Sequence, residues 1–393
     1  MNKNVGMLAI ALGLFAAGCG SHGTTPPMSQ GTSPQLHSAG AGVTRASSVA
    51  AAPSGWATTS TQALSLSNAT DLGPLDAGKT LTVRVALQMR NVSQAQQLVQ
   101  SHQTLSASAV KSQFAPTADQ AGAVASYLSS HGLTNVQVEP NNMLVSADGT
   151  VTQIQGAFDT KLESFTQNGA NVFANVAPVY VPQSLGGIAV AVLGLNDIHM
   201  LAKPAVSQCN FGLTSGTAVA APCTGNYGPA DYSKVYDVGN TPTGAQTTIA
   251  VMAEGNVSPV LSDLRYAEQQ FGLPQVPVST VHVGLSSPDQ AGLTEWDLDT
   301  QSSTGIAGNV SHLYIYDTTS LTDSDVSLEF NRWMSQDVAQ LGNASFGECE
   351  ALPYLDGAML LNDMVFLQAA VQGQTMFSSS GDNGSGCPVA AAT

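Results

Sequence analysis

The sequence predicts an α/β protein with a doubly wound parallel sheet, preceded by a smaller α+β region. Two observations carry this prediction. Between residues 247 and 379 short apolar runs alternate with helical stretches, and this alternation is typical of a parallel sheet built from βαβ units. Before residue 200 the strand-like runs instead alternate apolar with polar side chains, as half-buried strands do.

The α+β region begins with a clear strand and continues with capped helices. Residues 80–88 alternate apolar and polar side chains, which predicts a half-buried strand. Helical stretches follow near 93–101 and 119–131. Thr150 and Gln153 have the spacing of a capping box ahead of another helix. Further short strands are expected around Val136, Leu144, Leu162 and Ile188.

The parallel sheet is predicted from longer apolar segments. Strands are expected at 247–253, 310–316, 344–346 and 375–379, and helices at 328–340 and 359–371. In such sheets the functional residues lie at the carboxyl ends of the strands. The segments 347–350 and 381–384 fall at these ends.

Charged residues are unusually scarce. Asp, Glu, Lys and Arg make up 10% of the 393 residues, and the formal net charge is −16. Eleven scattered Lys and Arg residues argue against nucleic acid as a partner, which needs clustered positive charge. Once the carboxylates are protonated, only these residues and 7 His can be charged, so self-repulsion in acid stays modest. The composition therefore predicts an exported protein that tolerates acid.

The N-terminus also indicates export. Lys3 precedes an apolar run at 5–17, which is too short to span a bilayer. Small residues then precede Cys19, which resembles a bacterial lipobox with Cys19 as the lipidated residue. We expect 1–19 to be a lipoprotein-type signal peptide; an ordinary signal peptide is the alternative. The protein would be an outer-membrane lipoprotein or extracellular after processing, and would touch a membrane only through its lipid anchor.

The next segment and the remaining cysteines fit an exported chain. Residues 20–68 are rich in Ser, Thr, Gly, Ala and Pro, which predicts a flexible tether. The even set of four further cysteines favours two disulfides in an oxidising compartment. The expected pairs are Cys209–Cys223 and Cys349–Cys387. Free thiols remain the alternative, and no Cys or His spacing of a metal site is present, so no metal ligand is predicted.

Two carboxylates have a spacing that is informative. Glu295 and Asp299 lie four residues apart, so on a helix their Cβ atoms would be about 5–6 Å apart, where like charges repel. Such a pair is useful when it shares one proton and acts as an acid and base. A solvated surface pair is the alternative. Asp297 falls on the opposite helix face and is expected to be solvated.

Three motifs stand in a fixed order: Glu295–Asp299, Ser345–Glu350 and Ser379–Gly384. With them, the chain resembles the sedolisins, the serine-carboxyl peptidases related to kumamolisin. The likeness extends over almost everything from about residue 70. Motifs that look like the family's activation prodomain are Phe114-Ala115-Pro116, His131-Gly132-Leu133, Gly149-Thr150-Val151, Ala157-Phe158 and Val179–Pro182. Gly228–Tyr236 looks like the start of its mature enzyme.

The resemblance implies a subtilisin-like fold, incomplete here, behind a ferredoxin-like prodomain. Glu295 matches the catalytic base, Asp299 the group that orients it, and Asp382 the acid of the oxyanion hole. Glu titrates near ~4.3 and His near ~6.5, so a carboxylate base still works where imidazole is protonated. Trp296 would shield the site or line a substrate pocket, and an ordinary core tryptophan is the alternative.

The implied protein is a zymogen that acts on protein or peptide substrates. We expect an activation prodomain at 69–200 that inhibits its own enzyme, a linker with the cleavage site at 201–225, and the front of the peptidase domain at 226–393. The family's nucleophile lies in a Ser-Gly-Thr-Ser stretch downstream of the oxyanion aspartate, and none follows Asp382 here. The family's calcium site also comes from that missing C-terminal region, so no cofactor is expected within this chain.

Two functions are therefore weighed. The first is an acid-acting serine-carboxyl endopeptidase that is C-terminally truncated and inactive as written. The second is a non-catalytic lipoprotein or pseudoenzyme that binds peptides or inhibits through its prodomain. The first is preferred, because the loss of the last strands would leave an unpaired sheet edge, which stable proteins avoid.

Overall fold

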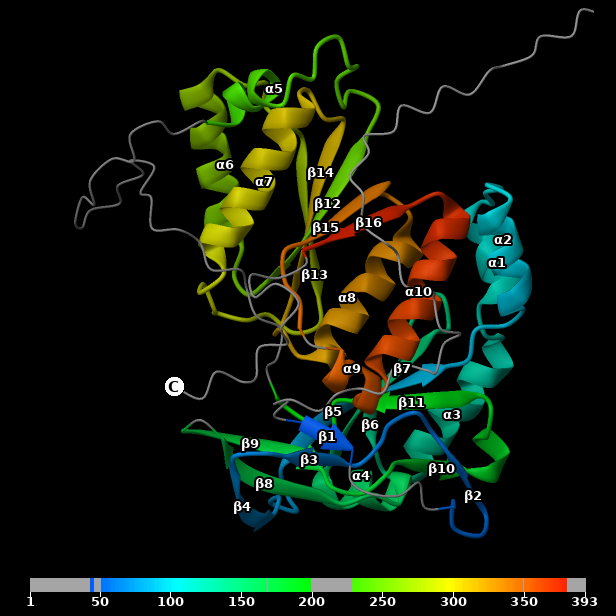
Figure 1. The fold of residues 1–393 in the computed structure, drawn as a ribbon. Coiled ribbons are helices and arrows are strands. Elements are labelled where there is room, and N and C mark those ends of the chain that lie inside the picture. Colours follow the sequence, from blue (N-terminus) through cyan, green and yellow to red (C-terminus); the bar gives the residue numbers. More distant parts are fainter. Residues whose placement is uncertain (1–42, 46–50, 168, 199–227, 349, 380–393) are drawn as a thin grey trace, which may run out of the picture. The chain divides into compact units, whose positions relative to one another are not determined.

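The computed structural model describes most of the chain between residues 43 and 379 (Figure 1). The described ranges are 43–45, 51–167, 169–198, 228–348 and 350–379. Cys19, Asp382 and the four cysteines of the predicted disulfides lie outside them. Among the described residues, none of the helices combines the length and apolar character that a membrane span requires.

The α+β region, residues 51–198, contains a four-stranded antiparallel sheet. Its strands are β5 (Thr80–Leu87), β6 (Thr134–Val138), β7 (Leu144–Thr150) and β11 (Ala189–Leu193), in the order β11-β5-β7-β6. Helix α3 (Ala118–Ser130) leads into β6, and α4 (Val151–Phe158) follows β7. This βαββαβ succession with antiparallel neighbours is the ferredoxin-like arrangement. The predicted class of this region is confirmed.

The α+β region also contains two more helices and a second antiparallel sheet. Helices α1 (Val92–Gln100) and α2 (Ala107–Phe114) lie between β5 and α3, and a separate antiparallel sheet joins β4 (Ala69–Pro74), β8 (Leu162–Gln167) and β9 (Ala170–Asn175). The capping box predicted at Thr150 is present, because the Thr150 hydroxyl accepts from the backbone of Gln153 at 3.3 Å and the Gln153 side chain accepts from the backbone of Thr150 at 2.8 Å.

The two faces of β5 pack against different partners. Successive side chains of a strand point to opposite faces. Val83 and Val85 belong to the core that α3 and α4 complete. Ala86 belongs instead to the core of the parallel-sheet region, and Arg84 is also buried on that face, where its guanidinium donates to Ser324 at 2.6 Å. One short strand therefore contributes to both cores.

The tether predicted at 20–68 was wrong at residues 43–45 and from residue 51 onward. Strand β2 (Trp56–Thr58) pairs with β10 (Tyr180–Pro182), and β3 (Leu64–Leu66) pairs with β1 (Val43–Arg45), both antiparallel. Threonine hydroxyls and backbone pairing order this segment rather than a periodic apolar face. Because this segment is rich in Ser and Thr, its composition did not predict strands β2 and β3.

We call residues 56–66 the strap. The Thr61 hydroxyl donates to the carbonyl oxygen of Asp356 at 2.8 Å and accepts from the backbone N–H of Val192 at 2.9 Å. The backbone N–H of Gln62 donates to the carbonyl oxygen of Leu355 at 2.7 Å. The strap thus connects β11 of the α+β region with the end of helix α9 (Ala351–Asp356) in the parallel-sheet region.

The parallel-sheet region, residues 228–379, confirms the predicted doubly wound α/β class. Its five strands are all parallel, in the order β13-β14-β12-β15-β16. They are β12 (Thr248–Glu254), β13 (Val278–Val283), β14 (His312–Thr318), β15 (Leu341–Ala344) and β16 (Thr375–Ser378). The strand order reverses at β12, and ligand sites of open α/β sheets lie at such points, outside the carboxyl ends of the strands.

Helices cover both faces of this sheet (Figure 1). The short helix α5 (Tyr232–Val235) precedes β12, and the longer helices are α6 (Ser258–Phe271), α7 (Leu293–Ala307), α8 (Asp323–Gln336) and α10 (Ala358–Gln372). Helices α6 and α7 pack together on one face, and α8 and α10 pack together on the other. Helix α7 also contacts β12, which brings it to the strand where the order reverses.

Candidate active site

Helix α7 holds the predicted carboxylate pair inside the protein. Glu295 is 5% exposed and Asp299 is 9% exposed, so the alternative of a solvated surface pair does not hold. The indole N–H of Trp296 donates to the carbonyl oxygen of Glu254, the last residue of β12, at 3.0 Å. This bond fixes the first turn of α7 at the carboxyl end of the central strand.

The carboxyl group of Asp299 is held from the loop after β15. The Ser345 hydroxyl donates to Oδ1 of Asp299 at 2.7 Å, and the Asn343 amide, which donates to the Ser345 oxygen at 3.3 Å, lies beside the same carboxyl group. Burial raises the pKa of Asp299 to about 6, and the side chains of Ser345 and Asn343 oppose that rise. Asp299 is therefore protonated in acid and ionised near neutral pH.

Trp296 is a core residue in this structure. Its side chain is 0% exposed and meets the ring of Phe346 edge-on, with the ring centroids 6.2 Å apart. The indole supports the site by tying α7 to β12. Its predicted contact with substrate stays a prediction.

The expectation that Asp297 is solvated was wrong. Helix α6 covers that side of α7, and Asp297 is half-buried against Asp263 of α6. Burial and the neighbouring Asp263 together raise the pKa of Asp297 to about 7. The sequence did not reveal this, because α6 was not among the predicted helices.

A second carboxyl cluster, made of Asp323, Glu348 and Asp356, was missed by sequence reasoning. Asp323 opens α8, Glu348 follows the Ser345 loop, and Asp356 ends α9. Burial, with like charges nearby, raises the pKa of Asp323 and Asp356 well above the usual range and that of Glu348 to about 7. The Asn196 amide donates to Asp356 at 3.5 Å. Only the fold brings these residues together, so no spacing in the sequence could signal them.

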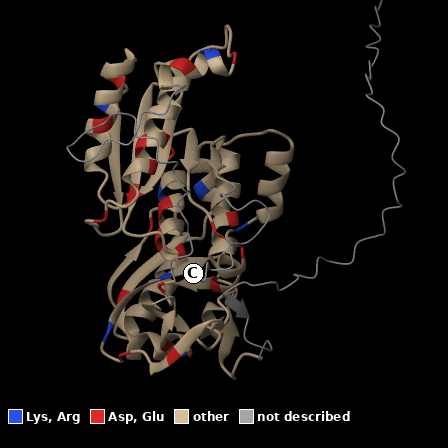
Figure 2. Cartoon of the chain, turned by 60° about the vertical axis from the view of Figure 1, so that its left-hand side comes forward, with Lys and Arg blue, Asp and Glu red and all other residues tan. Residues whose placement is uncertain are grey.

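Metal ligands were not predicted within the chain. In the described ranges no group of three or more His, Cys, Asp and Glu side chains is arranged to hold a metal ion. Lys and Arg are few and widely spread over these residues (Figure 2), and in the full sequence 27 Asp and Glu outnumber 11 Lys and Arg. The described residues offer carboxyl chemistry rather than a cationic surface.

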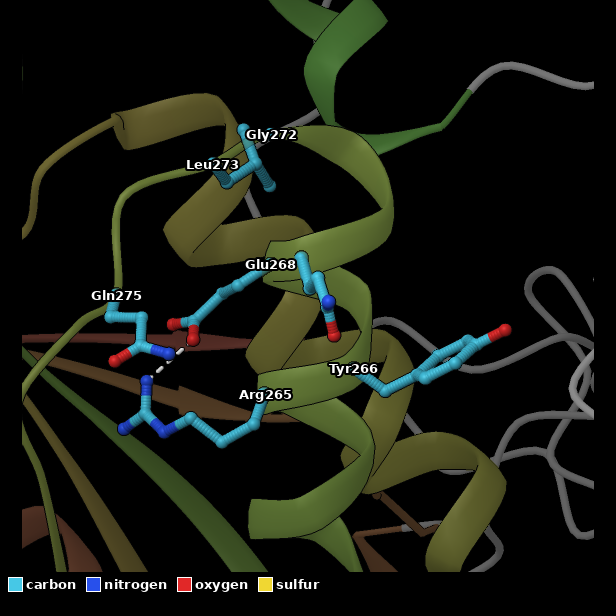
Figure 3. A pocket seen from close by; sticks show the side chains of 7 residues that line it. Arg265, Tyr266, Glu268, Gly272, Leu273 and Gln275 are labelled. Carbon is cyan, nitrogen blue, oxygen red and sulfur yellow. Dashed lines mark hydrogen bonds and ion pairs between the residues drawn. The ribbon is translucent and has the colours of Figure 1, made fainter.

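A surface hollow at the end of α6 has a structural explanation (Figure 3). It is lined by Arg265, Tyr266, Glu268, Gln269, Gly272, Leu273 and Gln275. Arg265 pairs with Glu268 and donates to the carbonyl oxygen of Val276 at 2.6 Å, while Glu268 accepts from the backbone N–H of Val276 at 2.9 Å. These polar groups hold the loop from α6 to β13, so we assign no chemistry to the hollow.

Comparison with known proteins gives concordant results. A family model described as "Pro-kumamolisin, activation domain" matches residues 67–198. Sedolisin of Pseudomonas sp. (strain 101) is 36% identical over 354 residues, which is 84% of this chain and 59% of that protein. Xanthomonalisin of Xanthomonas sp. (strain T-22) is 33% identical over 339 residues, 79% of this chain and 40% of that protein.

A solved structure of Pseudomonas sedolisin, complexed with two molecules of pseudo-iodotyrostatin, is 38% identical. It matches 40% of this chain and 45% of its own, with a TM-score of 0.39. The chain spans 59% and 40% of the lengths of the two curated relatives.

Proposed function

Since the chain belongs to the sedolisin family of serine-carboxyl peptidases, we propose that it forms the zymogen part of an acid-acting endopeptidase. The observation that carries the proposal is the buried pair Glu295 and Asp299, placed one helical turn apart at the carboxyl end of β12. A buried carboxyl pair is costly unless it shares a proton. A role in proton transfer explains why the protein keeps this pair buried despite its energetic cost.

In the proposed mechanism Glu295 takes the proton from a serine nucleophile, and Asp299 orients Glu295. The pKa of about 6 leaves Asp299 protonated in acid, where it can donate to an ionised Glu295 and keep one proton between the two groups. Asp382 is proposed as the acid that donates to the oxyanion. The serine itself is proposed to come from a segment outside these 393 residues.

The residues matched by the activation-domain model are proposed to inhibit the peptidase part within the chain. Two ion pairs support this. Arg84 of β5 meets Asp325 of α8 at 2.9 Å, and Arg332 of α8 meets Glu139 at 2.9 Å. Release is proposed to follow cleavage at 201–225 in acid, and the substrates are proposed to be proteins or peptides.

The remaining assignments rest on the sequence alone. We propose export with lipidation at Cys19, disulfides Cys209–Cys223 and Cys349–Cys387, and a calcium site built by residues outside this sequence. The domain limits at 1–19, 69–200, 201–225 and 226–393 are proposed in the same way; of the tether predicted at 20–68, residues 43–45 and 51–68 are left out because strands lie there.

The test is the activity of the protein that the whole gene encodes. We expect it to cleave a denatured protein substrate at about pH 3–5, and Glu295→Gln to lower kcat by about 10²- to 10⁴-fold, the usual contribution of a general base. Glu350→Gln, at an exposed glutamate nearby, is the matched control and should retain normal turnover. Circular dichroism would establish that both variants are folded.

Other outcomes would replace the proposal. Normal turnover in Glu295→Gln would remove this residue from the mechanism. A folded protein that binds peptides saturably without cleaving them at any pH would favour the non-catalytic alternative.

A further inference from the structure

Asp299 receives a side-chain hydrogen bond from far along the chain. The Ser345 hydroxyl donates to its Oδ1 at 2.7 Å, across a separation of 46 residues. The Asn343 amide in turn donates to the Ser345 oxygen at 3.3 Å. Ser345 is only partly exposed, and its loop directly follows β15, the neighbour of β12 in the sheet.

We propose that Ser345 is a positioning residue for the Asp299 carboxyl group, and that Asn343 aims the Ser345 hydroxyl. The inference rests on the proposed role of Asp299 as the group that orients Glu295. It goes further by assigning distinct tasks to the two oxygens of Asp299.

The direction of each bond follows from the donors that are present. Asn343 uses its N–H to reach the Ser345 oxygen, so the single proton of the hydroxyl is left to point at Oδ1 of Asp299. Oδ1 is then an acceptor whether or not Asp299 is ionised. The second oxygen, Oδ2, has no hydrogen-bond partner among the described residues. Oδ2 is therefore the oxygen that carries the proton when Asp299 is neutral.

A second serine contacts the same residue in a different way. The Ser303 hydroxyl donates to the main-chain carbonyl oxygen of Asp299 at 2.6 Å, one turn further along α7. Such a bond is ordinary in helices and leaves the carboxyl group free to rotate. Ser345 instead holds the carboxyl group itself and links it to the sheet. The two serines thus provide a matched pair for experiment.

Charged residues lie on the elements around Asp299: α6, which packs against α7, carries Asp263, Arg265 and Glu268, and the short helix at 229–231 carries Asp231. On its own helix the neighbouring acids are Glu295 and Asp297, and Glu254 ends the adjacent strand β12. Burial raises its pKa, and the side chains of Ser345 and Asn343 are the opposing contributions. The loss of the Ser345 hydroxyl should therefore register directly in the titration of Asp299.

The test is the pKa of the Asp299 carboxyl group in the full chain, followed by NMR with ¹³C-labelled aspartate. The resonance is assigned by its loss in Asp299→Asn. Ser345→Ala should raise the pKa by about one pH unit, because a hydrogen bond to an ionised group is lost. Ser345→Thr keeps the hydroxyl and should restore the original value. Ser303→Ala should leave the pKa unchanged.

Two outcomes would overturn the inference. In the first, Ser345→Ala leaves the pKa of Asp299 where it was; in the second, Ser303→Ala raises it equally. The readout needs no peptidase activity, so it is separate from the proposed function. If Ser345→Ala raises the pKa while Glu295→Gln leaves turnover normal, the positioning contact stands and the catalytic role fails.

Discussion

Replacement of Arg84 by methionine is expected to lower the free energy of unfolding by about 3–5 kcal/mol, the usual cost of breaking a buried ion pair. The Arg84 side chain is 8% exposed and its partner Asp325 is 13% exposed, with 2.9 Å between the charged atoms. The same guanidinium donates to Ser324 at 2.6 Å. Without Arg84, the buried carboxylate of Asp325 would have lost its cationic partner. Urea unfolding at neutral pH measures the loss.

The chain offers a matched control for this change. Lys161 pairs with Glu163 at 2.6 Å, but the Lys161 side chain is 59% exposed. Lys161→Met should leave the unfolding midpoint nearly unchanged, because exposed pairs contribute little. The double variant Arg84→Met/Asp325→Asn should recover part of the loss, since no buried carboxylate is left uncompensated. Equal effects of Arg84→Met and Lys161→Met would contradict the prediction.

The second large effect is a loss of stability as pH rises, caused by the cluster of Asp323, Glu348 and Asp356. The pKa of Glu348 is raised to about 7, so the folded state keeps a proton that the unfolded chain releases near its usual ~4.3. Stability from this group is complete at low pH and is lost as pH rises towards 7. The slope is about 1.4 kcal/mol per pH unit for each such group.

The measurement is urea unfolding from pH 4 to pH 8. Glu348→Gln should flatten the decline, because the amide needs no proton to remain neutral, and Glu350→Gln at an exposed site should reproduce the original curve. Parallel curves for the unmodified protein and Glu348→Gln would show that Glu348 does not titrate in this range. A confirmed decline would mean that the cluster stabilises the folded chain more at pH 4 than at pH 7.

Much of the fold could be predicted from local patterns. Strand β5, helix α3, the capping box at Thr150 and helix α10 all follow from periodicity and caps. Helix α8 begins at Asp323, earlier than the predicted residue 328, because its first turn is polar and lacks an apolar stripe. That turn is buried through contacts with Arg84 and the carboxyl cluster, which the local sequence does not encode.

The candidate site was also predicted only in part, because the sequence shows local spacing but not which elements pack together. The spacing of Glu295 and Asp299 is a helical signal, so it could be read directly. The partnership with Ser345 depends on β15 lying beside β12, and this is a property of the sheet order. The environment of Asp297 depends likewise on α6, whose packing against α7 only the fold reveals.

The strap has a consequence for the order in which the molecule assembles. Thr61 and Asp356 are 295 residues apart, so their contact is among the slowest kinds to close. During synthesis from the N-terminus, β2 can find β10 once residue 182 has emerged. Thr61 must then wait until residue 356 has been made. The contact between the strap and α9 can therefore form only after most of the described chain has been made.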